Sequence, residues 1–150
     1  LKYYSSNGIN VPIETSGVNA DITNAVPNWR WSGDLVYSSD KITVDFAARG
    51  VSAGVYNNTN VECTSGCPVS TTKAPTIDNN HIDSNDLWDL SLQYKFLNKD
   101  TQAFLTISNL LNTAPPFIGG SVGSTYYAGQ SNTGYDRLGR MFLAGVRFKM

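Results

Sequence analysis

The chain lacks the features of several protein classes. Its 150 residues include one histidine, two cysteines and two methionines, and its formal charge is −1 at pH 7. Proteins that bind nucleic acid normally present a basic face, so no nucleic-acid partner is expected. Long apolar runs are also missing, since MFLAGV at 141–146 is among the longest, whereas a transmembrane helix needs about 20 predominantly apolar residues. A transmembrane β-barrel stays possible, because alternating strands average to a mildly polar composition such as the mean hydropathy of −0.24.

A leader peptide and a catalytic motif are also absent from the sequence. The first residues, LKYYSSNG, are too polar for a signal peptide and include no initiator methionine, so we expect a mature product or a piece of a longer chain. No Gly-rich phosphate loop follows a strand, and no nucleophile has a recognisable partner in His81. The acids around His81 (IDNNHIDSND) follow no metal-ligand spacing and are interpreted as a solvated loop. We therefore expect no enzyme, no metal and no cofactor.

The two cysteines, Cys63 and Cys67, are close together in the loop-like run VECTSGCPVSTTKAP. Such a pair in a Gly/Ser/Pro setting predicts a small disulfide ring in an oxidising compartment, such as the periplasm or the cell surface. A metal site is the weaker alternative, because the chain has one histidine and no second cysteine pair.

Alternating apolar and polar residues predict an all-β, antiparallel fold. Strands are expected near residues 29–37, 41–56, 86–97, 101–111 and 135–150, and residues 1–28 read mostly as loop. The phase slips near Gly50, so Gly50 or Gly54 is expected to mark a bulge. Phe104 is a misfit, since it falls on an otherwise polar face. The connections run long, short, long, short, long, which is typical of outer-membrane barrels with short periplasmic turns and longer outer loops.

Aromatic residues are expected at both ends of one strand face, at the level of lipid headgroups. If the chain ends on the periplasmic side, the two girdles contain Tyr37, Tyr94, Phe96 and Phe148 at the inner end and Trp29, Trp31 and Trp88 at the outer end. The opposite face carries charges of both signs, which indicates a wet lumen or a polar partner. Its polar residues are Arg30, Asp34, Asp45, Arg49, Asp89, Gln93, Lys95, Gln102, Arg137, Arg147 and Lys149.

The last sixteen residues, YDRLGRMFLAGVRFKM, resemble the closing strand of TonB-dependent outer-membrane receptors. That motif usually reads Tyr-Asp, Gly-Arg, an aromatic, then Gly-Val-Arg-Phe-Lys and a final aromatic; here the last residue is Met150. PNWRWSGDLVY is similar to the Pro-x-Trp-Arg strand of the family, and DLWDLSLQYKF to its Asp-Leu-Ser-x-x-Tyr strand. LTISNLLNTAPP is similar to its Asn-Leu-x-Asn/Asp-x-x-Pro-Pro motif, so that the resemblance covers roughly residues 27–150.

The resemblance implies the C-terminal part, about five or six strands, of a barrel of about 22 strands in the outer membrane of a Gram-negative bacterium. The complete receptor would bind a scarce solute (a metal chelate, cobalamin or an oligosaccharide) and import it with TonB-coupled energy. The plug domain and the TonB box are expected outside this chain. Implied partners are lipid, lipopolysaccharide, TonB through the plug, the remaining barrel strands and the outer-membrane assembly machinery. The assembly signal would comprise Phe142, Val146, Phe148 and Met150.

Candidate ligand contacts lie in two predicted outer loops, because amide and aromatic groups at a rim suit a sugar or a chelate. They are Asn79, Asn80 and His81 in one loop and Tyr126, Tyr127 and Gln130 in the next. For each residue the alternative is an ordinary solvated loop position. Two other classes of function stay open: a small self-contained outer-membrane barrel serving as an adhesin or structural protein, and a secreted, carbohydrate-binding β-sandwich.

Overall fold

The computed structural model describes residues 4–5, 13–20, 26–96, 101–118, 129–130, 135 and 138–148. All regular structure in these ranges is β, and they contain no helix. No helix of the described residues therefore has the length and apolar character needed to cross a membrane. The predicted all-β fold with antiparallel sheets is confirmed, except that the short pairing of residues 61–62 with 76–77 is parallel, and the described strands do not close into a barrel.

The chain divides into two compact units that alternate along the sequence. The first contains Leu1–Arg30, Val51–Asn85 and Pro115–Asp136; the second contains Trp31–Gly50, Asp86–Ala114 and Arg137–Met150. The long connections of the sequence thus belong mainly to the first unit, and the long strands mainly to the second.

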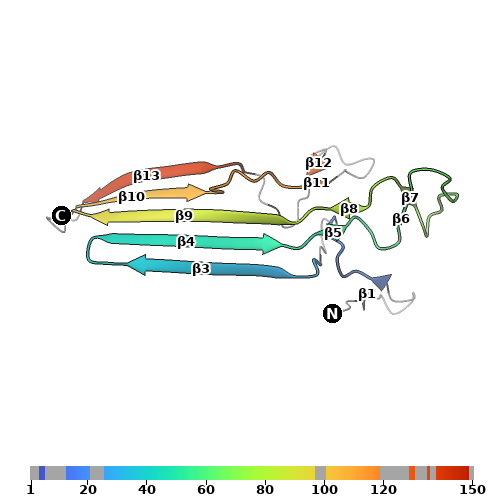
Figure 1. Cartoon of the computed structure of the whole chain (residues 1–150), viewed down its shortest axis with the longest axis horizontal. Helices are drawn as coiled ribbons and strands as arrows, with labels where there is room; N and C mark the ends of the chain where they lie inside the picture. Colours follow the sequence, from blue (N-terminus) through green and yellow to red (C-terminus); the bar gives the residue numbers. More distant parts are fainter. Residues whose placement is uncertain are drawn as a thin grey trace. The chain divides into compact units, whose positions relative to one another are not determined.

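The second unit is built on a five-stranded sheet with the order β13-β10-β9-β4-β3. Neighbouring strands run in opposite directions, as Figure 1 shows. The strands are β3 (Arg30–Ser38), β4 (Ile42–Val51), β9 (Asn85–Lys95), β10 (Thr101–Ser108) and β13 (Met141–Phe148). A tight turn joins β3 to β4, where Ser39 N donates to Ile42 O at 2.8 Å. Among these five long strands, each one therefore lies beside the long strand that comes before or after it in the sequence.

The strand expected at 41–56 is interrupted after Val51. Residues Gly54–Val55 form a separate strand, β5, which pairs with β8 (His81–Ile82) in the first unit. Gly50 shows why the chain needs glycine at this point: a Cβ there would overlap Trp31 Nε1 and Asp86 Oδ1. The phase slip that the sequence indicates near Gly50 thus lies where the long strand ends.

Two further strands are shorter than expected. β10 ends at Ser108 because Asn109 takes a left-handed backbone conformation (φ 52°), which asparagine tolerates better than most residues. Its main-chain N donates to Asp89 Oδ1 at 2.8 Å. β13 begins at Met141, not at 135, and Tyr135 instead packs against Ile82 in the first unit.

The first unit consists of loops joined by two-residue strands. Besides β5 and β8 these are β1 (Tyr4–Ser5), β2 (Ile13–Glu14), β6 (Val61–Glu62), β7 (Thr76–Ile77), β11 (Phe117–Ile118) and β12 (Gly129–Gln130). Its described core is small: Ile82 and Tyr135 are buried, with Ala20, Val51 and Tyr56 packed against them. The predicted disulfide between Cys63 and Cys67 is confirmed, with the Cα atoms 5.6 Å apart.

A buried amide connects distant parts of this unit. The Asn19 side chain is 1% exposed, and its Nδ2 donates to Ser52 O at 2.9 Å and to the Tyr135 hydroxyl at 3.2 Å. Burial raises the pKa of Tyr135, which the hydrogen bond from Asn19 and the charge of Arg30 partly offset. These contacts join segments 33 and 116 residues apart, so the long connections are folded together.

Candidate functional site

The register of the sheet gathers apolar side chains on one face. Residues directly opposite each other in an antiparallel pair project to the same side. Leu105 on β10 lies opposite Leu92 on β9 and Ala144 on β13. The same register continues along the three strands, and the apolar face there comprises Leu90, Leu92, Tyr94, Ala103, Leu105, Ile107, Phe142, Ala144 and Val146.

Large side chains of this apolar face remain exposed. Phe142 is 66% exposed and Phe148, two strand positions beyond Val146, is 69% exposed. The buried apolar residues of the second unit, within the described ranges, are Ala48 and Leu87. Soluble monomers rarely expose large contiguous apolar patches, so this face is a candidate contact surface for an apolar neighbour.

Aromatic rings meet near both ends of the strands. Where β9 begins, the Trp88 ring lies 6.0 Å from Trp31 and 5.4 Å from Phe46, measured between ring centroids. Where β9 ends, Tyr94 and Phe96 meet edge to face at 5.1 Å. The remaining residues of the expected girdles, Trp29, Tyr37 and Phe148, are all more than half exposed.

The opposite face of the sheet is polar. Gln102 lies opposite Lys95 and Arg147, and Thr106 lies opposite Ser91 and Leu143. Further toward the start of β9, Arg49 Nη1 is 2.6 Å from Asp89 Oδ2, and the other oxygen of Asp89 accepts the bond from Asn109 N. The polar face thus carries paired charges of both signs, as the alternation predicts.

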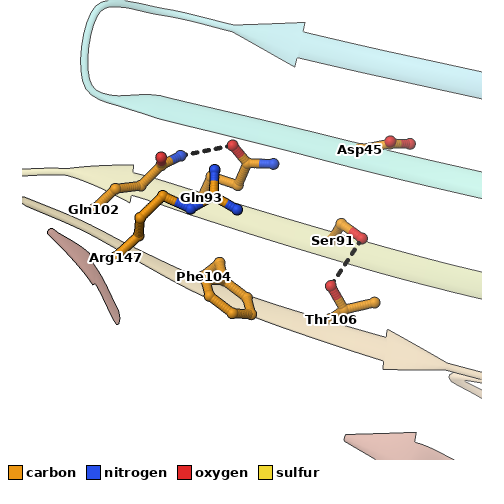
Figure 2. A pocket seen from close by; sticks show the side chains of 7 residues that line it. All are labelled: Asp45, Ser91, Gln93, Gln102, Phe104, Thr106 and Arg147. Atoms are coloured by element: carbon orange, nitrogen blue, oxygen red, sulfur yellow. Dashed lines mark hydrogen bonds between the residues drawn. The ribbon is translucent and has the colours of Figure 1, made fainter. Parts of the chain in front are cut away.

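A pocket of about 210 Å³ lies on the polar face (Figure 2). Two hydrogen bonds order its walls: Gln102 Nε2 donates to Gln93 Oε1 at 2.7 Å, and Ser91 Oγ donates to Thr106 Oγ1 at 3.3 Å. Its lining residues are Asp45, Ser91, Gln93, Gln102, Phe104, Thr106 and Arg147. The pocket therefore combines an aromatic ring, amides, hydroxyls and one charge of each sign.

Phe104, the misfit of the alternation, is explained by Gly145. The two residues are directly opposite in the β10–β13 register, and a Cβ on Gly145 would lie 2.6 Å from Phe104 Cζ. The ring therefore occupies the space above the glycine on the polar face. The alternation predicts Gln93, Gln102 and Arg147 on this face. It does not predict the pocket, because the pairing of Phe104 with Gly145 depends on the strand register.

The loop residues proposed as ligand contacts have different environments. Asn80 is 9% exposed, and its side chain accepts from Asn57 N (3.2 Å) and Asn60 Nδ2 (3.0 Å) and donates to Asn57 O (3.0 Å). Its amide is therefore engaged in holding the loop. Asn79 and His81 are exposed, with Asn79 Oδ1 accepting from His81 N at 2.8 Å and His81 Nε2 lying 3.2 Å from Asp83 Oδ1.

Other expected site residues lie wholly or partly outside the described structure. Tyr126, Tyr127 and Met150 fall outside the described residues, and Gln130 is described only as a backbone position in β12. Among the residues that are described, no three or more His, Cys, Asp or Glu side chains gather in a way that could hold a metal ion.

Comparison with known proteins adds no relative: no protein-family model, curated protein or solved structure matches this chain.

Proposed function

We propose that the chain forms the last strands of the β-barrel of a TonB-dependent outer-membrane receptor, which binds a scarce solute and imports it to the periplasm. The observation that carries this proposal is the two-faced sheet. Its register gathers exposed apolar side chains on one face and polar and charged side chains on the other. A membrane barrel wall needs this arrangement, with the apolar side toward lipid and the polar side toward the lumen.

The aromatic contacts support a membrane boundary at each end of the strands. Trp31 and Trp88 meet near the start of β9, and Tyr94 and Phe96 meet near its end. Aromatic rings with a polar edge are suited to the headgroup level on either side of the hydrocarbon. In this orientation the long connections face the cell exterior and the β3–β4 turn faces the periplasm.

The edges of the sheet support a larger assembly. β3 and β13 are the outer strands of the five, so each has one neighbour in the sheet. Unpaired backbone groups are costly in hydrocarbon, where only closed sheets satisfy them all. The remaining strands of the receptor would pair with these two edges, and this part would supply lumen wall and outer loops.

The high solvent exposure of side chains on the apolar face also favours lipid, and not a second sheet, as the neighbour of that face. In a soluble β-sandwich the inner side chains interdigitate with an opposing sheet about 10 Å away and are buried. Phe142 and Phe148 retain about two thirds of their exposure. A lipid bilayer provides an apolar neighbour without any further protein layer.

The proposal is tested with the complete gene product expressed in a Gram-negative host. We expect the protein in the outer-membrane fraction, with the shift in gel mobility on heating that folded barrels show. Solute uptake should be lost in an otherwise identical strain without TonB. A folded, monodisperse protein in detergent-free buffer would contradict the membrane assignment, and uptake that is unchanged without TonB would contradict the transport mechanism.

A further inference from the structure

Phe104 gives the polar face an aromatic surface among hydrogen-bonding groups. One side of its ring is occupied by the strand at Gly145, which has no side chain to displace it. The ring also lines the pocket, so it is in contact with both the strand and the pocket space. Covering a glycine accounts for the ring's position, but it does not account for the polar groups that surround the ring.

The polar groups around the ring come from four neighbouring strands, β4, β9, β10 and β13. Figure 2 shows Gln93, Gln102 and Arg147 toward one end of the pocket and Ser91 with Thr106 toward the other. The amides of Gln93 and Gln102 already bond each other at 2.7 Å, which fixes their orientation and leaves each amide with further donor or acceptor capacity. The Ser91–Thr106 pair is ordered in the same way.

The described lining of the pocket carries one ionisable side chain of each sign. Arg147 supplies a guanidinium and Asp45 a carboxyl group, which is hydrogen-bonded to the Asp34 carboxyl just beyond the lining. A strongly anionic ligand would be opposed by Asp45, and a cation by Arg147. A neutral ligand rich in hydroxyl groups can donate to the carboxylate and accept from the guanidinium, and its ring carbons can pack on an aromatic face.

From this combination we propose that the pocket is a binding site for a neutral sugar ring, with Phe104 as its stacking surface and Arg147 as its main donor. This inference rests on the proposed function, because it names carbohydrate as the class of solute that passes along this lumen wall. The pocket is distinct from the outer-loop residues Asn79 and His81, and lies on the strands themselves.

The test uses the complete receptor in detergent micelles and a panel of neutral trisaccharides of glucose, xylose, mannose and galactose. We expect a saturation-transfer NMR signal from at least one of them. Phe104→Leu should weaken its binding about tenfold, and Phe104→Tyr, which keeps the ring, should restore it. Arg147→Met should weaken binding by a similar factor through the lost charged donor.

Phe148→Leu is the matched control, since it removes the same ring from the apolar face and should leave the Kd unchanged. Each variant is checked for the heat-dependent gel mobility of the folded barrel. Absence of binding by every trisaccharide would overturn the inference, as would equal effects of the Phe104→Leu and Phe148→Leu changes. Binding that falls steeply between low and high salt would also overturn it, because that behaviour indicates an anionic occupant or an acidic protein segment.

The two proposals fail in different ways. TonB-dependent uptake of a solute that is not a carbohydrate, unaffected by Phe104→Leu, would refute the sugar site and leave the receptor function intact. Sugar binding by a protein that is soluble without detergent would refute the receptor function.

Discussion

A lysine on the apolar face should destabilise the protein in a way that depends on depth in the bilayer. Leu105 lies opposite Leu92 and Ala144, four residues from the first residue of β10. At about 3.4 Å per residue and a strand tilt of about 40°, it would lie about 10 Å below the headgroup level, close to the middle of an apolar band about 25 Å tall. Leu105→Lys should therefore cost roughly 2–4 kcal/mol, or about 30-fold to several hundred-fold in the folding equilibrium constant.

The matched control is Leu143→Lys, which makes the same chemical change on the opposite face. Leu143 lies opposite Thr106 and is 62% exposed on the polar face, so its replacement should change the stability by no more than about 0.5 kcal/mol. Both variants of the complete protein are unfolded with guanidinium in phospholipid vesicles and followed by tryptophan fluorescence. Equal stabilities of the two variants would refute the assignment of a lipid face.

Three further predictions concern local contacts. Burial raises the pKa of Tyr135, so the neutral phenol should contribute its full share to the free energy of unfolding below about pH 10, and this share should fall as the pH rises through the folded-state pKa. Tyr135→Phe should remove this loss of stability at alkaline pH, as measured by unfolding at a series of pH values. Asn80→Ala should cost about 1–3 kcal/mol of stability and speed amide exchange in the loop, whereas Asn79→Ala, which removes one hydrogen bond made by an exposed side chain, should have a smaller effect; equal effects would refute the role of the Asn80 amide. Gly145→Ala should cost roughly 1 kcal/mol by pushing on the Phe104 ring, and a double-mutant cycle with Phe104→Ala should show coupling; additive effects would refute the contact.

The alternation of the sequence predicts the sheet well because a half-buried strand has a period of two residues. Each long strand of the structure lies within or beside its expected range, and the polar and apolar faces separate as that period requires. The disulfide could be predicted because Cys63 and Cys67 are close in sequence, so that their pairing depends little on the rest of the fold.

Long-range packing accounts for what the sequence left undetermined. Tyr135 is expected to begin the terminal strand, but its hydrogen bond with Asn19 holds it in the first unit, and β13 begins at Met141. Asn80 looks like a rim residue, yet Asn57 and Asn60 enclose its amide. Periodicity cannot anticipate such contacts, because it describes one segment at a time.

The most direct test of the proposed lipid-facing orientation of the sheet is a nitroxide scan along β13 of the complete protein in phospholipid vesicles. The two cysteines of this chain form a disulfide, so single introduced cysteines can be labelled at positions 142, 143, 144, 146 and 147; Gly145 is left unchanged because Phe104 fills the space above it. The two-faced sheet predicts high accessibility to oxygen, which partitions into lipid, at 142, 144 and 146, and high accessibility to a water-soluble nickel complex at 143 and 147. Uniform accessibility to the nickel complex, or an oxygen signal without a period of two, would contradict it.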